Sequence, residues 1–178
     1  EQPISYVECH DQSMVGDKTL IFRMIDRKMY DRMSIFTPDM DVDRGVALHK
    51  MIRLVTLGLA SGGYLNFMGN EFGHPEWIDF PREGNGWSHK YARRQWNLVD
   101  NKELCFHYLG DFDEKMISVV KSIKAIQKTP VQEVWHNDGD QVLAFQRGDY
   151  SLFFNFLLFF RSSSVISILF SSLSLFNG

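Results

Sequence analysis

His10 and Asp11 are the first residues whose types suggest chemistry, because they follow directly on the apolar run Ile4–Cys9. A carboxylate at the end of a buried strand can stabilise an oxocarbenium ion or act as an acid or base. An imidazole beside it can donate a hydrogen bond to a sugar hydroxyl. The alternative is structural: Asp11 caps the next helix and His10 is a loop residue. Taken by itself, the pair favours the structural alternative.

A second candidate group lies in the stretch from residue 73 to residue 100, which is rich in Pro, Gly, Trp and charge, as in a long functional loop. Flat aromatic faces beside bidentate donors and acceptors suit sugar rings, which have an apolar face and a hydroxyl rim. The alternative is that the aromatic side chains pack the loop onto the fold, and the residues alone leave both open. The side chains concerned are Trp77, Trp87, Tyr91 and Trp96 with Glu76, Asp79, Arg82, Arg93 and Arg94.

Metal and phosphate sites are not expected. Asp39, Asp41 and Asp43 alternate like the opening of a calcium loop, but Arg44 stands where that loop needs glycine and Lys50 where it needs glutamate. Capping of the helix that follows is the better interpretation. The histidines do not have zinc-ligand spacing, and HExxH, CxxC, GxGxxG and Walker sequences do not occur. We therefore predict no metal ion and no organic cofactor.

The elements that must position these residues follow from the hydrophobic pattern. Ile4–Cys9 and Tyr64–Met68 are short apolar strands that end in polar residues, and helical spacing predicts helices over Thr19–Met33 and Arg44–Leu57 between them. A further helix is predicted over Asp111–Gln127. This is the layout of two successive strands of a parallel α/β barrel, where chemistry lies at the carboxyl ends of strands.

After Pro130 the hydrophobic period changes to two. This predicts an antiparallel meander of three strands, Val131–His136, Gln141–Gln146 and Tyr150–Phe156. We therefore divide the chain into residues 1–128, the carboxyl-terminal portion of a (β/α)8 barrel, and residues 129–156, the start of an all-β domain.

Composition excludes several classes. The 178 residues suffice for one core but are fewer than the roughly 250 of a closed barrel. Net charge is −3 with both signs interspersed, so no nucleic acid is expected. Two cysteines make no disulfide framework, which favours a reducing compartment. The amino terminus has neither a signal-peptide pattern nor a methionine, so the chain is expected to be a fragment.

Residues 157–178 form an atypical tail of Leu, Phe, Ser and Ile with the single charge of Arg161. The apolar runs Ser151–Phe160 and Val165–Phe176 are each shorter than the ~18 residues of a membrane span. A single tilted span is the less favoured alternative, and no membrane association is expected. Non-native sequence, such as a frameshift or a translated intron, is the preferred interpretation.

A series of ordered motifs from about residue 3 to residue 156 resembles the eukaryotic-type 1,4-α-glucan branching enzymes of the α-amylase superfamily. His10-Asp11 alone would indicate only the superfamily, whereas the run Met68–Trp77 points to the branching enzymes. The resemblance is carried by Glu8-Cys9-His10-Asp11-Gln12, Asp43-Arg44-Gly45, His49–Arg53, Tyr64–Trp77, Asp79-Phe80-Pro81-Arg82, Gly84-Asn85 and Ala92-Arg93-Arg94-Gln95-Trp96.

The resemblance implies a (β/α)8 barrel followed by an antiparallel β domain, and a retaining glycosyltransferase reaction that uses three carboxylates. Asp11 matches the carboxylate that stabilises the transition state, and His10 matches the histidine that contacts the sugar. The resemblance further implies substrate binding by Gln12, Trp77, Arg94 and Trp96. The nucleophile and the acid/base belong to strands outside this chain, so the fragment itself is expected to be inactive and poorly folded alone.

The predicted function is therefore that of a segment of a branching enzyme, which transfers an α-1,4-glucan chain to a 6-hydroxyl in glycogen or starch synthesis. The alternatives are a hydrolase of the same superfamily and a non-catalytic glucan-binding protein. The expected partner is an α-glucan polysaccharide, and the expected location is the cytoplasm, or the plastid for a plant protein. The sequence leaves the oligomeric state open.

Overall fold

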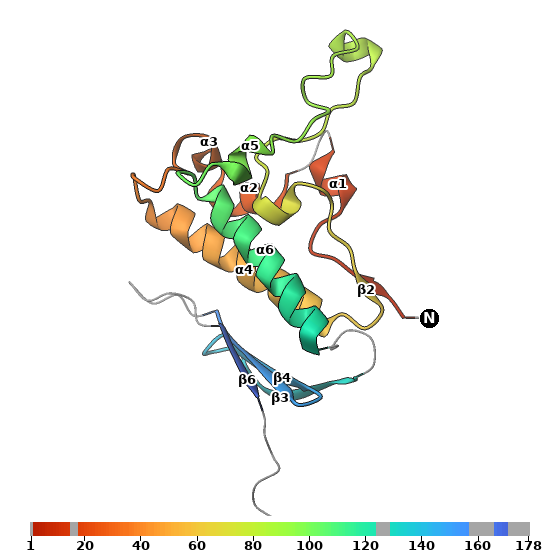
Figure 1. Ribbon diagram of the computed structural model, residues 1–178, viewed down its shortest axis with the longest axis vertical. Coiled ribbons are helices and arrows are strands. Elements are labelled where there is room, and N and C mark those ends of the chain that lie inside the picture. The colour runs from red at the N-terminus through yellow and green to blue at the C-terminus, as the bar shows by residue number, and fades with distance from the viewer. Residues whose placement is uncertain (1, 15–17, 124–128, 157–165, 171–178) are drawn as a thin grey trace, which may run out of the picture.

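The computed structural model describes residues 2–14, 18–123, 129–156 and 166–170. Two long helices, α4 (Met40–Leu59) and α6 (Phe106–Ile123), form the middle layer. An antiparallel sheet lies on one side of them, and short helices and loops lie on the other (Figure 1). The shorter elements are β1 (Ile4–Ser5), α1 (His10–Ser13), α2 (Leu20–Ile25), α3 (Lys28–Asp31), β2 (Gly63–Tyr64), η1 (Asn70–Phe72), η2 (Glu83–Asn85) and α5 (Asn97–Asp100).

Helix α4 begins at the acidic segment that resembled a calcium loop. The carboxylate of Asp39 accepts hydrogen bonds from the backbone N–H groups of Asp41, at 2.9 Å, and Val42, at 3.3 Å. Asp41 and Asp43 lie in the first turn, where negative charge favours the helix dipole. The capping interpretation is thus confirmed, and the helix extends a few residues beyond the predicted Arg44–Leu57 at both ends.

The single helix predicted over Thr19–Met33 is wrong, because the chain forms two helices there, α2 and α3. Asp26 separates them with a backbone φ of 49°, a positive value that a right-handed α-helix cannot contain. The hydrophobic spacing continues across this break, since Ile21, Ile25 and Met29 are all buried. Periodicity alone therefore could not reveal the break.

The strands β1 and β2 pair in parallel, with Ile4 opposite Gly63 and Ser5 opposite Tyr64. Both are shorter than the predicted Ile4–Cys9 and Tyr64–Met68. A strand residue needs a hydrogen-bonded neighbour, and beyond Ser5 and Tyr64 the chain turns toward α1 and η1. The class is α/β as predicted, but the strands in the described part of the chain do not close a barrel.

The predicted meander is present as β3 (Val131–Asn137), β4 (Val142–Arg147) and β5 (Tyr150–Asn155), each within a residue or so of its predicted bounds. A fourth strand, β6 (Ile166–Phe170), pairs with β5 and completes the sheet order β3-β4-β5-β6. Most of the tail 157–178, which we interpreted as non-native sequence, lies outside the described residues. No helix among the described residues is long and apolar enough to span a bilayer.

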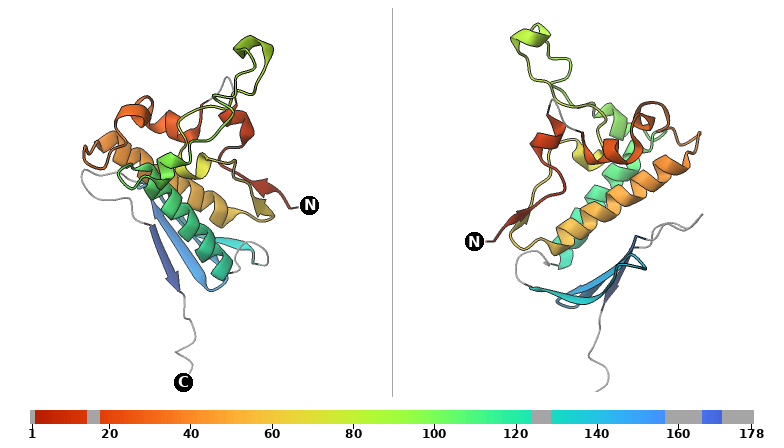
Figure 2. Two further views of the ribbon diagram at one scale, coloured as in Figure 1. Left: turned by 45° about the horizontal axis from the view of Figure 1, so that its top comes forward. Right: turned by 180° about the vertical axis from the view of Figure 1, so that it is seen from behind.

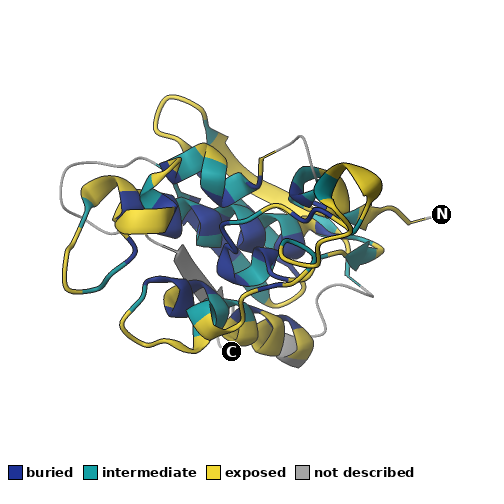
Figure 3. Ribbon diagram, turned by 90° about the horizontal axis from the view of Figure 1, so that it is seen from above, coloured by how far each residue is buried: buried dark blue, intermediate teal, exposed yellow. Residues whose placement is uncertain are grey.

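Two clusters of buried side chains hold the layers together, and buried positions concentrate along the central helices (Figure 3). One cluster joins α2, α3 and the first half of α4 to α6. The other joins the second halves of α4 and α6 to the sheet through Met51, Leu57, Met116, Phe145 and Phe154. The sheet therefore packs on the same helix pair as Tyr64 of β2.

Candidate functional site

Helix α1 carries three of the predicted site residues. His10 Nε2 lies 3.1 Å from Asp11 Oδ1, and the two side chains are 63% and 72% exposed. The side-chain oxygen of Gln12 accepts a hydrogen bond from the backbone N–H of Cys9 at 2.9 Å, which caps the helix. His10 and Asp11 thus face solvent, paired with each other, whereas Gln12 is engaged with the backbone at the start of the helix.

The two strand-end runs meet at α1. Leu65 N donates to Ser5 O at 2.9 Å, and the hydroxyl of Ser13 donates to Asn70 Oδ1 at 2.9 Å in the interior. The ring of His10 lies 6.4 Å from the ring of Phe67, measured between centroids. The position of His10 and Asp11 therefore depends on the segment that follows β2, although fifty or more residues separate the two runs in sequence.

Arg94 packs against the segment that follows β2, and its side chain is only 8% exposed. Its Nε donates to Met68 O at 2.8 Å, and its Nη1 donates to Glu76 O at 2.8 Å. Its guanidinium carbon lies 5.5 Å from the centroid of the Phe67 ring. Burial lowers the pKa of Arg94, and the carboxylates of Glu71 and Glu8 oppose that shift. The guanidinium is therefore an internal support of the loop around Phe67.

His74 is the second buried group of this network, at 1% exposed. Its Nε2 accepts a hydrogen bond from Gln95 N at 3.0 Å, so that nitrogen must carry a lone pair. Burial, and then the charge of Arg94, lower the pKa of His74 to about 4. Geometry and electrostatics agree that His74 is neutral at physiological pH.

Glu8 is a buried acid two residues before the start of α1. It is 6% exposed and accepts a hydrogen bond from Leu20 N at 2.5 Å. Burial raises its pKa, while that hydrogen bond and the charges of Arg53 and Arg94 act in the opposite direction. Through this hydrogen bond Glu8 links the segment before α1 to the start of α2.

The aromatic candidates divide between packing and exposure. Trp77 stacks on Tyr91 with centroids 5.1 Å apart and an interplanar angle of 23°, and it remains 41% exposed. Trp96 contacts Phe72 at 5.2 Å and is 48% exposed. Each indole therefore packs in part against the fold, as the packing alternative predicts, and has free surface as well, so sugar binding stays a prediction.

Sequence reasoning gave no role to Glu8, Ser13, Asn70 and His74, although they position the site. Glu8 had a usable signal, because a carboxylate inside an apolar run must find a partner when it is buried. The other three lie in or beside the quoted motifs, but nothing in the residue types indicates that their partners are Asn70, Ser13 and Gln95.

One trio of possible metal ligands occurs among the described residues. Single ligand atoms of Cys9, His10 and Asp11 all lie within 4.8 Å of one another. Cys9 Sγ lies 3.4 Å from Asp11 Oδ2, so contacts within this one turn explain the proximity. A cavity of about 430 Å³ lies elsewhere, against the first turns of α4 and the α2–α3 junction, lined in part by Met24, Arg27 and Arg44. The exposed chemistry of α1 does not open into that cavity.

Fold and site together define an α/β protein with an exposed carboxylate and imidazole at the carboxyl end of a parallel strand pair, beside a loop rich in aromatic residues. No family model matches the chain. The chain is 52% identical over 159 residues to the 1,4-alpha-glucan-branching enzyme of Solanum tuberosum. It is 48% identical over 157 residues to the chloroplastic/amyloplastic enzyme of Oryza sativa subsp. japonica and to the enzyme of Felis catus.

These matches cover 88% of this chain and 18%, 19% and 22% of the three relatives, so the chain spans about a fifth of their length. A solved structure from Thermus thermophilus superposes on 85% of the chain and 24% of its own length, with a TM-score of 0.44 at 20% identity, too low to support a fold assignment. The chain is therefore homologous to a segment of the 1,4-alpha-glucan-branching enzymes, and the resemblance found in its motifs is confirmed.

Proposed function

We propose that this chain is part of a 1,4-alpha-glucan-branching enzyme, which transfers an α-1,4-glucan chain to a 6-hydroxyl and so makes an α-1,6 branch. The observation that carries the proposal is the 48–52% identity to enzymes of that name over 88% of the chain. The exposed His10–Asp11 pair supports it, because a group that acts on a polymer must be reachable from solvent. The enzyme would act in the cytoplasm, or in the plastid of a plant.

The proposed chemistry is that of a retaining glycosidase with an acceptor hydroxyl in place of water. A carboxylate nucleophile from another part of the enzyme attacks C1, the C1–O4 bond breaks, and a second carboxylic group gives its proton to O4. That group then removes the proton of the acceptor 6-hydroxyl while O6 displaces the nucleophile from C1. Asp11 stabilises the positive charge at C1 in both transition states, and His10 donates a hydrogen bond to the same sugar.

The remaining site residues divide by exposure. Trp77 and Trp96 have free indole surface on which a pyranose ring can stack. Gln12 and Arg94 act through the elements they hold, α1 and the loop around Phe67. We therefore assign glucan contact to Trp77 and Trp96. Gln12 and Arg94 hold the neighbouring elements in position.

The finer fold assignment is also a proposal. We assign β1, α4 and β2, within residues 1–128, to a (β/α)8 barrel whose other strands lie elsewhere in the enzyme. Residues 129–156 are the start of its carboxyl-terminal β domain. The parallel pairing of β1 with β2 supports this, as does the exposure of Ile4, Tyr6 and Leu65 along that pair, since inner barrel strands are covered on both edges.

A second candidate is a non-catalytic glucan-binding protein. The exposed indole surfaces beside α1 favour it, because binding needs no carboxylate beyond those present here. The two candidates differ in turnover and agree in their ligand.

The test is Asp11→Asn in the full-length protein that contains this chain, with Asp31→Asn, an exposed acid on α3, as the matched control. Branching is measured as new α-1,6 linkages after incubation with linear α-1,4-glucan. We expect a loss of roughly a hundredfold or more for Asp11→Asn and no loss for the control. Wild-type protein that yields only shorter linear chains would be a hydrolase. Glucan affinity without turnover would establish the second candidate.

A further inference from the structure

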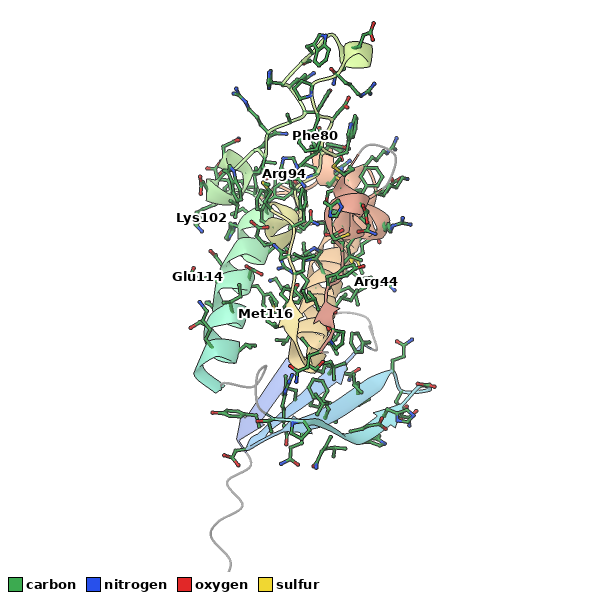
Figure 4. All side chains as sticks on the ribbon, turned by 90° about the vertical axis from the view of Figure 1, so that its right-hand side faces the viewer. Arg44, Phe80, Arg94, Lys102, Glu114 and Met116 are labelled. Carbon is green, nitrogen blue, oxygen red and sulfur yellow. The ribbon has the colours of Figure 1, made fainter. Side chains whose placement is uncertain are left out.

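Residues 79–91 form a projection that we call the aromatic arm. Its base is closed by a hydrogen bond from Asp79 N to Tyr91 O at 3.1 Å. It contains η2 and extends away from the layered body in every view (Figures 1 and 2). Figure 4 shows Phe80 on the arm and Arg94 nearer the helices. Every residue of the arm except Asp79 is exposed or half-buried, so the arm has no hydrophobic core of its own.

Hydrogen bonds within the arm give it shape. The guanidinium of Arg82 pairs with the carboxylate of Asp79 through contacts of 2.9 and 3.3 Å. Asn85 Oδ1 accepts hydrogen bonds from Arg82 N at 3.0 Å and Ser88 N at 3.2 Å, and Trp87 N donates to Arg82 O at 3.0 Å. This density of local contacts holds the arm in one conformation where apolar burial cannot.

Trp87 is the least expected residue of the arm. Its φ is 59°, in the left-handed region where glycine or asparagine is at ease and a bulky side chain is strained. The strain is not offset by burial, because the side chain is 66% exposed, and Phe80 is 52% exposed. A protein gains nothing in folding from a strained, exposed indole. A strained and exposed indole is the pattern expected of a side chain that contacts another molecule.

The root of the arm is attached to the helix that carries the candidate catalytic pair. Ile78 N donates to Ser13 O at 2.6 Å, and Met14 and Ile78 form a parallel bridge. The stacked pair Trp77–Tyr91 lies at this root. Exposed aromatic surface therefore extends from beside α1 out along the arm.

We propose that Trp87 and Phe80 bind an α-1,4-glucan chain at a distance from the bond that is broken, so that the arm is an extended polymer-binding surface. The identity of the polymer rests on the proposed function. The chemistry of the arm fits a neutral polysaccharide. Its aromatic faces can stack on sugar rings, and the positive, negative and neutral side chains between them can donate or accept hydrogen bonds with the hydroxyl groups. These include Arg82, Glu83, Asn85, His89 and Lys90.

The test measures affinity for maltoheptaose of the full-length protein that contains this chain, by tryptophan fluorescence, with thermal unfolding of each variant recorded in parallel. Trp87→Gly removes the indole and also relieves the backbone strain. We expect its unfolding temperature to be unchanged or higher while its affinity falls at least about tenfold. Trp87→Phe keeps an aromatic face and should retain most of the affinity. Trp135→Ala, at an exposed indole on β3, is the matched control and should bind like wild type.

Equal affinity of Trp87→Gly and wild type would overturn the proposal, as would a full-length wild-type protein that does not bind maltoheptaose. Self-association that is lost in Trp87→Gly, without maltoheptaose affinity, would replace it with a protein–protein contact. An error in the proposed function would give a different result. If Asp11→Asn leaves branching intact while Trp87→Gly loses affinity, the arm remains a glucan-binding surface and the assignment of Asp11 is wrong.

Discussion

The hydroxyl of Ser13 donates a hydrogen bond to the side-chain oxygen of Asn70 at 2.9 Å, and both side chains are almost completely buried. This bond joins α1, which carries His10 and Asp11, to η1. We expect Ser13→Ala to destabilise the fold by about 1–3 kcal/mol, because it leaves a buried amide oxygen short of a donor. The double variant with Asn70→Ala should lose less than the sum of the single losses, as measured by urea unfolding. Strict additivity would show that the bond does not couple the two elements.

Gly69 is expected to tolerate no side chain. Its φ is 93°, and a Cβ there would lie 2.7 Å from Arg94 Nε. Gly86 is the matched control, with a φ of 62° and nothing within 4 Å of its Cβ. Both alanine variants carry backbone strain of roughly 1–2 kcal/mol, and only Gly69→Ala also displaces Arg94. A larger loss of unfolding free energy for Gly69→Ala than for Gly86→Ala is expected, and equal losses would contradict it.

Arg147, on β4, connects the sheet to the end of α4 by hydrogen bonds. Its Nη1 donates to Gly58 O at 2.6 Å and to Ala60 O at 2.7 Å, and its side chain is 3% exposed. Arg147→Lys keeps the charge but cannot make the same forked set of bonds. We expect a loss of about 2–4 kcal/mol in unfolding free energy. Arg27→Lys, at an exposed position, should change it little.

Acid should destabilise the fold through His74. Its folded-state pKa of about 4 lies below the ordinary value of 6.5. The unfolded chain therefore binds more protons between these values, and stability falls as pH falls through that window. The full loss is roughly 3 kcal/mol at the bottom of the window. His74→Gln should flatten the dependence of unfolding free energy on pH, whereas His89→Gln, at an exposed position, should not.

His49 is a buried residue whose replacement we expect to stabilise the fold, unlike the substitutions above. It is 1% exposed, burial lowers its pKa to about 3, and neither ring nitrogen has a hydrogen-bond partner among the described residues. His49→Leu should therefore raise the unfolding free energy at neutral pH by about 1–2 kcal/mol. A lower value would mean that the imidazole has a partner outside the described residues.

Helix α4 and the meander were predictable because their signals are local. The spacing of Leu48, Met51, Ile52 and Val55 marks one face of a helix, and alternation with Asn-Asp-Gly and Arg-Gly-Asp turns marks the strands. The ends of β1 and β2 were not predictable, because a strand ends where its neighbour ends. The break at Asp26 depends on one dihedral angle that the hydrophobic pattern does not encode.

The candidate site also contains features that the local sequence predicts and others that depend on distant parts of the chain. The exposure of His10 and Asp11 is what their polar side chains predict. The run before them was expected to be buried, and that expectation is wrong in part, because Ile4 is 65% and Tyr6 51% exposed. The burial of Arg94 does not follow, because its neighbour Arg93 has the same side chain and is exposed. Which of the two turns inward depends on carbonyl groups contributed by Met68 and Glu76.

The pairing of Ile4 with Gly63 has a consequence for the order of folding. Strands β3, β4 and β5 are joined by short turns, so their contacts form at little loss of chain entropy. The β1–β2 pair must first enclose α1 to α4 in one loop, and long-range parallel contacts form slowly. We expect pulsed hydrogen exchange to protect amides of β4 before those of Leu65. The candidate catalytic pair on α1 would then reach its final position late, after the part of the chain that carries no chemistry has already folded.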